Sequence, residues 1–445
     1  MNISIALIAL IILFITMLYQ IKIWKVRVLL SPGFYFSIIW ILGLIGLLIF
    51  HSVNILIETY PKYIDELNIL LAYTGICFIL VTKIGVNKVN PSIININYFS
   101  TFRIFKMISI FYFLLALYVF VVEGSGFDFG KARDNMHETI ENRSFLVGYF
   151  RLLSLPLSIY AGSKIIKILL KIEKTSIARN LFLILPFIAD TLFSLTEGGR
   201  VAMVYGMLFY VVGAVLSVPL SFKVKEKKKI ILYGVITLVF INSMISWVAS
   251  VRSNSDGNTG TTEIIKEKLG KFSFLYGAIE YVNSSYVGYQ YRRTDAVDSE
   301  LGYGQYTFNG FINWQIPFAG RFGVDDASIA KALDIFYHNQ ETYDYSRQYY
   351  YVTHSAYIPI IKDFGFKGAF FAIIFIVYLS HIFFVKIQKT RSIWKSSTFF
   401  FYYLFFIYWT KSNFYGTLSE SVLVPLYGFL IIDIINGNTK KKRAI

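Results

Sequence analysis

The sequence predicts an all-α, polytopic membrane protein with about eleven transmembrane helices and one large helical loop on the outer side of the membrane. Three observations predict this class: the 445 residues are 56% hydrophobic, only 16% are charged, and the apolar residues form continuous blocks. The blocks approach the roughly 17 to 25 residues with which a helix crosses a bilayer. Because lipid offers no hydrogen-bond partner to the backbone, such blocks must be helices, whereas strands of a membrane barrel would alternate.

Apolar runs of near-spanning length mark the helices in chain order. The candidate spans lie at about 2–19, 33–50, 67–82, 104–122, 145–169, 180–195, 201–220, 230–249, 367–385, 397–410 and 421–436. They divide the chain into transmembrane helices 1–8 (1–249), a large loop (250–365), and transmembrane helices 9–11 with a basic tail (366–445). The first run lacks the basic start and the cleavage site of a removed signal peptide, so we expect it to stay as an anchor.

The net charge of +16 follows the membrane topology. If the chain begins outside, roughly 25 of the 43 Lys and Arg residues fall on inner connections, together with only Glu173 and Glu226. The outer connections 51–66, 123–144 and 250–365 hold slightly more acid than base. The positive-inside rule therefore puts the N-terminus outside and the C-terminus in the cytoplasm, and we expect no nucleic-acid partner.

Cysteine and metal patterns exclude several kinds of site. Cys77 is the one cysteine and lies in an apolar run, so neither an internal disulfide nor a cysteine-based metal cluster can form. The sequence has no His-Glu-x-x-His pair and no acidic calcium loop. We therefore expect no metal and no other cofactor.

The loop at 250–365 is too long for a passive connection, because loops beyond about 15 residues usually have structure or function of their own. Thr261 and Thr262 are followed by apolar residues at helical spacing, and Asp325 or Asp326 can cap a second helix. Both helices could lie on the membrane surface or pack over the bundle.

The clearest candidate for chemistry is Arg200, which follows Gly198 and Gly199 where a helix begins from the outer side. Glycines allow close approach of the backbone, helix N-termini attract anions, and Arg offers a flat fork to phosphate oxygens. This pattern predicts an anion site, here a site for a substrate diphosphate. Alternatively, Arg200 snorkels to lipid headgroups or pairs with Glu197.

Further arginines on the outer side extend this candidate site. An anionic, lipid-linked substrate would need several such cations, and headgroup anchoring or pairing with nearby acids is the alternative. The candidates for diphosphate binding are Arg252, just past the eighth span, and the loop residues Arg292, Arg293, Arg321 and Arg347. Arg151 lies inside a span, where a buried pair or a cavity is the commoner explanation.

Two residues before the ninth span are candidate catalytic groups. His354 can accept a proton near neutral pH, although a structural role, or His338 in its place, is the alternative. Asp363 is either a helix cap or a catalytic or orienting carboxylate. The run that contains Tyr349, Tyr350 and Tyr351 could stack on sugar rings or form an interfacial aromatic belt.

The whole layout and two local patterns resemble the Wzy-type O-antigen polymerases, the oligosaccharide repeat-unit polymerases of bacterial surface polysaccharides. Residues 196–200 (Thr-Glu-Gly-Gly-Arg) look like the family's small-residue turn with Arg at a helix start. Residues 353–355 (Thr-His-Ser) and 363–368 (Asp-Phe-Gly-Phe-Lys-Gly) are similar to its polar, aromatic stretch before Asp-Phe-Gly-x-x-Gly. Many members carry an Asn-x-Tyr-Thr-like element where this chain has Val-Thr-His-Ser at 352–355.

This resemblance implies a GT-C-like glycosyltransferase, a multi-pass protein of the bacterial inner membrane with a periplasmic N-terminus and loop. The implied reaction transfers a growing glycan from undecaprenyl diphosphate to a sugar hydroxyl of another lipid-linked repeat unit. The implied partners are that lipid-linked oligosaccharide, membrane lipids and a chain-length regulator. Two other functions remain open: an O-antigen ligase, which shares the lipid-linked donor, and a flippase or other transporter of the lipid-linked sugar.

Overall fold

The structure is a computed structural model in which every regular element of the described residues is helical. The described residues are 2–52, 61–86, 102–122, 153–173, 178–196, 201–218 and 355–388, with 147, 150, 151, 286, 288–290, 293, 301–304 and 307. The all-α prediction is therefore confirmed for this part of the chain.

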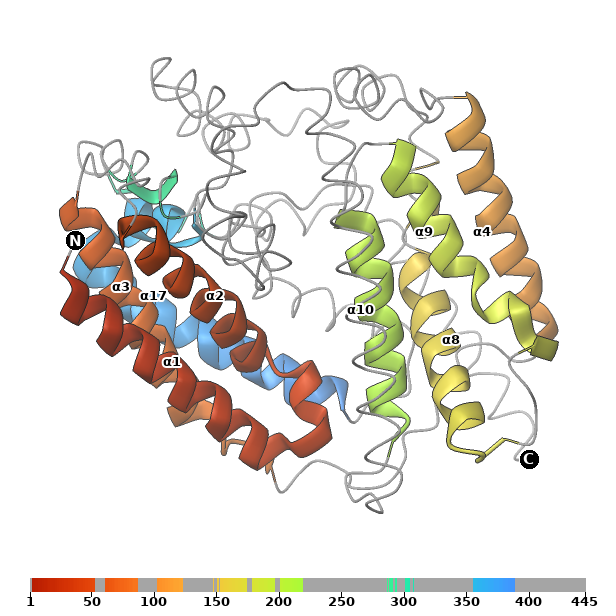
Figure 1. Ribbon diagram of the computed structural model, residues 1–445, viewed down its shortest axis with the longest axis horizontal. Helices are drawn as coiled ribbons and strands as arrows, with labels where there is room; N and C mark the ends of the chain where they lie inside the picture. Colours follow the sequence, from red (N-terminus) through yellow and green to blue (C-terminus); the bar gives the residue numbers. More distant parts are fainter. Residues whose placement is uncertain are drawn as a thin grey trace. The chain divides into compact units, whose positions relative to one another are not determined.

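Figure 1 shows the helices, which begin and end close to the apolar blocks of the sequence. They are α1 (Ile3–Trp24), the 3-10 helix η1 (Lys25–Leu30), α2 (Pro32–Ser52), α3 (Pro61–Val81), α4 (Phe102–Val122), α8 (Ser154–Leu169), the 3-10 helix η3 (Ala178–Leu183), α9 (Leu185–Thr196), α10 (Val201–Leu216) and α17 (Tyr357–Ile387).

Four stretches of the described residues are long and apolar enough to cross a membrane: Ile3–Leu30, Lys62–Val81, Phe102–Val122 and Tyr357–Ile387. Shorter apolar helices occupy Pro32–Leu48, Leu185–Thr196 and Gly206–Leu216. These helices indicate a membrane protein. The remaining candidate spans, at 230–249, 397–410 and 421–436, lie outside the described residues.

Two helices begin earlier than their apolar blocks. α3 starts at Pro61 instead of near residue 67, and α17 starts at Tyr357 instead of near residue 367. In both cases the first turns carry polar residues that a hydropathy window excludes. Those turns hold the polar contacts described below.

The chain forms two compact units. Unit 1 contains Met1–Val89, Ala278–Ile387 and Thr398–Leu423, and unit 2 contains Asn90–Gly277, Gln388–Ser397 and Val424–Ile445. The boundaries predicted at 249/250 and 365/366 follow membrane topology, whereas these units follow contacts.

In unit 1, α1 and α3 run in the same direction. α2, which lies between them in the sequence, runs in the opposite direction. The amide of Asn2 donates to Asp65 at one end (2.8 Å), and Gln20 donates to Thr82 at the other (2.5 Å). The hydroxyl of Ser31, just before α2, donates to Gln20 (2.6 Å), so α2 begins where α1 ends. This is the alternation that successive membrane crossings require.

α17 runs parallel to α3. The ring centroids of Tyr73 and Phe370 lie 4.7 Å apart. Eleven residues further along the chain from each of these residues, the His381 Nε2 lies 2.9 Å from the carbonyl oxygen of Ile84, just past the end of α3. The topology read from the sequence gives the first, third and ninth spans one common direction. The relative directions of α1, α3 and α17 agree with it.

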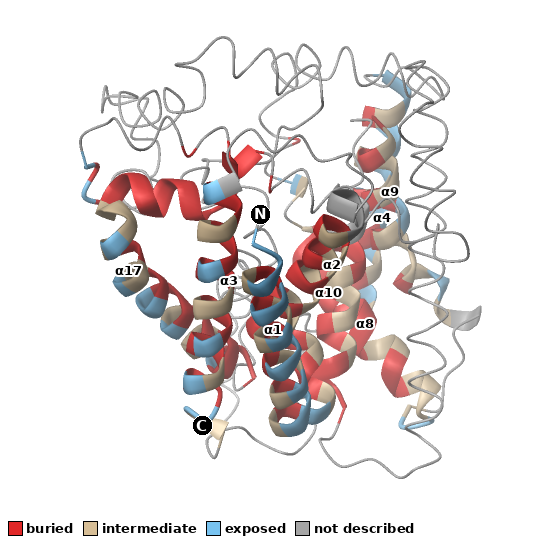
Figure 2. Ribbon diagram, turned by 60° about the vertical axis from the view of Figure 1, so that its left-hand side comes forward, coloured by how far each residue is buried: buried red, intermediate tan, exposed pale blue. Residues whose placement is uncertain are grey.

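α1 divides cleanly into a buried stripe and an exposed stripe. Its buried residues recur every three or four positions, whereas Ile8, Ile11 and Leu18 are more than half exposed (Figure 2). An exposed stripe of Ile and Leu on a helix apolar enough to span a bilayer is typical of a surface that faces lipid.

α17 consists of a short segment and a long segment joined at Gly365. Gly365 has φ 68° and ψ 170°, which is non-helical and favours a residue without a Cβ. Tyr357 to Asp363 are all buried, whereas the long segment exposes residues along one side (Figure 2). The long segment therefore starts just after Gly365, close to the predicted start of the ninth span near residue 367.

Unit 2 contains α4, α8, α9 and α10. α8 and α10 approach so closely that a Cβ on Gly213 would lie 1.9 Å from the carbonyl oxygen of Ile159. The hydroxyls of Ser217 and Ser163 are also hydrogen-bonded (2.6 Å). Small residues at such contacts are the usual means by which membrane helices pack at short range.

Candidate functional site

The large loop is fastened to the first turns of α3 by a buried ion pair. The Nε of Arg293 donates to one Glu66 oxygen (2.5 Å) and its Nη2 to the other (3.3 Å). The Tyr289 hydroxyl donates to the first oxygen as well (2.6 Å), and the Tyr63 ring lies 5.5 Å from the guanidinium. Arg293 is only 8% exposed. A cation of the loop and a carboxylate of the helix thus fix the loop in place.

The surroundings of Arg293 and Tyr289 favour the protonated form of both side chains. Burial disfavours the charge of Arg293, but the hydrogen bonds and charge of Glu66, aided by Tyr289 and Tyr63, raise the pKa of Arg293 above its ordinary value. Burial, and then the charge of Glu66, raises the pKa of Tyr289 well above its ordinary value. Arg293 and Tyr289 therefore keep their protons near neutral pH.

Beneath the ion pair, the loop enters the core of unit 1. The hydroxyl of Tyr286 donates to Asn68 on α3 (3.2 Å), and its ring meets the Trp40 ring edge-on with centroids 5.4 Å apart. Tyr286 and Tyr289 belong to the same buried cluster as side chains of α1, α2, α3 and α17. Tyr286 and Tyr289 are therefore part of the packed core of unit 1.

Asp363 fastens a second part of the loop. Its carboxylate accepts a hydrogen bond from the amide of Thr307 (2.5 Å), and its carbonyl oxygen accepts one from the amide of Tyr303 (3.1 Å). The carbonyl of Lys362 binds the amide of Gly302 (3.2 Å). Tyr303 has φ 49°, an uncommon value for a residue with a Cβ, so this turn is strained. Asp363 holds the strained turn against α17.

The cap of α17 is Ser355, not Asp363. The hydroxyl of Ser355 accepts from the amide of Tyr357 (3.3 Å), and its carbonyl accepts from the amide of Ile358 (3.1 Å). The helix thus begins six residues before Asp363 and before the glycine that re-starts it. Asp363 anchors the loop, and its roles as a cap of the long segment and as a catalytic group stay predictions.

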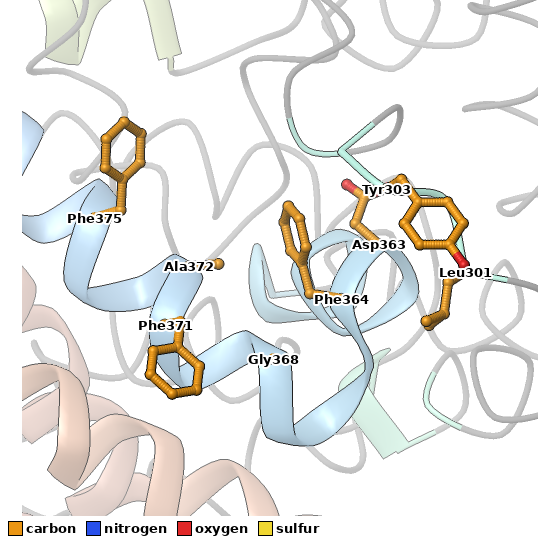
Figure 3. Close-up of a pocket in the computed structure, with 8 residues that line it drawn as sticks. All are labelled: Leu301, Tyr303, Asp363, Phe364, Gly368, Phe371, Ala372 and Phe375. Atoms are coloured by element: carbon orange, nitrogen blue, oxygen red, sulfur yellow. The ribbon is translucent and has the colours of Figure 1, made fainter.

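A hollow of about 400 Å³ opens beside this anchor. The residues that line it are Leu301, Tyr303, Asp363, Phe364, Gly368, Phe371, Ala372 and Phe375, and we call it the α17 hollow. Figure 3 shows Leu301 and Tyr303 on the loop side and the phenylalanines on the helix side. The hollow thus joins an apolar wall to the loop turn that Asp363 holds.

Most of the predicted site residues lie outside the described residues. They are Arg252, Arg292, Arg321, Arg347, Tyr349, Tyr350, Tyr351, His354 and Arg200 itself. Arg200 immediately precedes Val201, the first residue of α10, and His354 immediately precedes the cap Ser355. Arg293 and Asp363 are described, and each binds a partner from another part of unit 1.

Unit 2 has its own buried carboxylate, Asp190 on α9. It accepts hydrogen bonds from the hydroxyls of Tyr112 on α4 and Ser154 on α8, both 2.7 Å long. The guanidinium of Arg151 lies 5.6 Å from the Phe193 ring and acts electrostatically on Asp190. The sequence favours a buried pair for Arg151, and Asp190 is its charged neighbour. α10 also touches the carboxylate, since a Cβ on Gly206 would lie 2.2 Å from it.

Sequence reasoning missed Glu66 and Asp190. Glu66 lies where an outer connection is expected, and only an earlier start of α3 would have put it on a helix. Asp190 had a usable signal, because a lone acid inside an apolar run is costly and therefore typical of a functional or tightly paired group. The sequence alone could not identify Tyr289 and Arg293 as the partners of Glu66, because both lie more than 220 residues away from it.

Among the residues that the structure describes, no three His, Cys, Asp or Glu side chains are grouped so that they could hold a metal ion. No protein-family model, no curated protein and no solved structure matches the chain. Function must therefore be argued from the site itself.

Proposed function

We propose that the protein is a glycosyltransferase of the bacterial inner membrane that polymerises a surface polysaccharide. It transfers the growing glycan from undecaprenyl diphosphate to a sugar hydroxyl of another lipid-linked repeat unit, as in the O-antigen polymerases that the sequence resembles. The proposal includes the GT-C-like arrangement of about eleven spans, the periplasmic N-terminus and loop, and the cytoplasmic C-terminus. The partners are the lipid-linked oligosaccharide, membrane lipids and a chain-length regulator.

The observation that carries the proposal is the attachment of the large loop to α17 at Asp363. Polar backbone groups of the loop and a helix start meet there beside an apolar hollow. A lipid-linked sugar needs this combination, because its glycan is polar, its diphosphate is anionic and its tail is apolar. An enzyme that grips all three parts must bring a loop and membrane helices together.

The chemistry follows from the leaving group. Breaking the sugar–phosphate bond develops charge on a diphosphate, and preorganised arginines stabilise such charge without a metal. In the proposal Arg200 and Arg252, with loop arginines, perform this role. Arg293 contributes mainly by holding the loop, because two of its donor groups already bind Glu66.

One group must also accept the proton of the attacking sugar hydroxyl. Asp363 is fully buried and its carboxylate binds the Thr307 amide, which favours an orienting role for it. His354, one residue before the cap of α17, is then the general base. Tyr349, Tyr350 and Tyr351 supply rings for the sugar faces.

Reconstituted protein with lipid-linked repeat units tests these assignments. We expect Arg200→Ala to lower the polymerisation rate about 100- to 1000-fold, because one donor to the developing charge is lost. Arg200→Lys should recover only part of the rate, because the charge remains but the fork does not. Normal insertion with full-length polymer from Arg200→Ala would remove Arg200 from the mechanism.

The base assignment has a matched control within the loop. We expect His354→Ala to lower the rate about 100-fold or more, as is typical for loss of a general base, and to remove the acid limb of the pH profile. His338→Ala should leave both unchanged. Equal losses in the two variants would show that neither histidine acts as the base.

A deletion strain separates the proposal from its alternatives. Surface glycans capped with one repeat unit identify a polymerase. Polymer that is made but remains unattached identifies a ligase, and precursor trapped inside the cell identifies a flippase.

A further inference from the structure

The α17 hollow lies on a helix that is long and apolar enough to span a membrane. The stretch Tyr357–Ile387 has 31 residues and contains a continuous apolar window of membrane-spanning length. Two of the phenylalanines in the hollow point outward, since Phe371 is 78% exposed and Phe375 is 55% exposed. Exposed aromatic side chains on a spanning helix contact lipid chains, so the natural occupant of the hollow is apolar and chain-like.

Two glycines keep the hollow open. Gly365 breaks the helix, which turns the short segment away from the long one. Gly368 allows Phe364 to pack closely against the helix, because a Cβ there would lie 2.9 Å from the Cβ of Phe364. The backbone of α17 at these two glycines thus helps to shape the hollow.

The ends of the hollow differ in polarity. Phe371, Ala372 and Phe375 form its apolar end on the long segment of α17, whereas Asp363 and Tyr303 form the end at the loop. Lys367 is exposed and lies one helical turn before Phe371, so both project from the same face of the long segment. A cation on the helix face that carries Phe371 complements an anionic headgroup attached to a hydrocarbon chain.

We propose that the α17 hollow binds the isoprenoid chain of the lipid-linked substrate, with the adjoining phosphate beside Lys367. This inference rests on the proposed function, and it names the part of the protein that holds the lipid. The choice of the substrate over a bilayer phospholipid follows from the loop end of the hollow. A chain seated there brings its phosphate to Asp363 and the loop, where transfer is proposed, whereas a resident phospholipid would block that end.

Photo-crosslinking tests the occupant directly. The full-length protein carries p-benzoylphenylalanine in place of Phe371, in vesicles that contain labelled undecaprenyl phosphate and labelled phosphatidylglycerol. The matched control carries it in place of Ile8, which is 56% exposed on α1 of the same unit but does not line the α17 hollow. We expect the ratio of isoprenoid to phospholipid adducts to be about tenfold higher at position 371, equivalent to about 1.4 kcal/mol of preference.

A charge variant tests the headgroup contact. Lys367→Gln should lower the isoprenoid adduct at position 371 about tenfold, and unlabelled undecaprenyl phosphate should compete with the remainder. Lys62→Gln removes another exposed lysine of unit 1 and should leave the adduct unchanged. Equal ratios at positions 371 and 8 would overturn the proposal, as would an adduct at 371 that is mainly phospholipid.

The experiment distinguishes this inference from the function on which it rests. If the reconstituted protein polymerises but shows no preference for the isoprenoid at position 371, the lipid-binding role of the α17 hollow is contradicted and the proposed polymerase function is retained. A strong preference at position 371, without polymerisation, would leave a lipid-phosphate site in a protein of another function.

Discussion

Both units contain carboxylates that accept hydrogen bonds, but the donors belong to a loop in unit 1 and to helices in unit 2. In unit 1, Asp363 and Glu66 accept hydrogen bonds from a loop, and their partners are 56 and 227 residues away in sequence. In unit 2, Asp190 accepts from hydroxyls of α4 and α8 and touches α10, so every described contact joins helix to helix. A buried carboxylate can thus hold a functional segment in place or hold a bundle together, and the origin of its donors tells which.

The largest effect should come from unit 2. Asp190→Ala removes the buried acceptor of the Tyr112 and Ser154 hydroxyls, which we expect to cost on the order of 3 kcal/mol. The unfolding midpoint of the purified protein in detergent measures it. Asp190→Asn, which keeps the shape and one acceptor, should lose less.

Asp190→Ala also tests whether the cluster in unit 2 stabilises the bundle or belongs to the functional site. If Asp190→Ala keeps the wild-type unfolding midpoint but cannot make polymer, the cluster in unit 2 belongs to the site and not to the scaffold.

A smaller, local effect is expected at the ion pair of unit 1. Glu66→Ala removes charged hydrogen bonds to Arg293 and Tyr289, and we expect a local loss of about 1.5–3 kcal/mol. The segment around Arg293 should loosen while the helices stay packed, because α1, α2 and α3 also contact one another. Faster proteolysis within 250–365, at a nearly unchanged unfolding midpoint, would show this.

A charge swap provides the control for that experiment. The double variant Glu66→Arg/Arg293→Glu restores opposite charges and should slow proteolysis relative to either single variant. If the double variant is as sensitive as the singles, the pair contributes shape and not charge.

The smallest effect should come from one neutral hydrogen bond in unit 1. Tyr357 and Thr74 share a hydrogen bond of 2.7 Å in the core, and Tyr357→Phe should cost about 1 kcal/mol because Thr74 keeps its bond to the Leu70 carbonyl. Tyr303→Phe, at a residue that is 81% exposed, serves as the control and should be neutral in the same unfolding experiment. Equal losses would mean that the hydroxyl of Tyr357 is not what stabilises the core.

The helices were largely predictable from the sequence. Continuous apolar runs leave no alternative to a helix in lipid, and the bounds of α2 and α4 agree with the expected spans within a few residues. The errors lie where polarity rises within a helix, as in the first turns of α3, which carry Lys62, Asp65 and Glu66. Hydropathy cannot tell a polar helical turn from a loop.

The site was predictable only in part. Asp363 was recognised from its place before a span, but its partner Thr307 was not, because a backbone amide carries no sequence signal. A helix start near Gly365 was expected from the sequence, but the short helical segment before it, from Tyr357 to Asp363, was not. Long-range pairs such as Glu66 with Arg293 leave no periodic pattern in a single sequence.

The ion pair between Glu66 and Arg293 also has a consequence for synthesis. The described helices of unit 2 lie between residues 102 and 218, so they can pack while the ribosome still holds the rest of the chain. Unit 1 must wait for residues 293 to 387, which makes α1, α2 and α3 an unfinished surface until late in translation. A chain truncated after residue 249 should therefore retain the protease resistance of α8, α9 and α10 but lose that of α3.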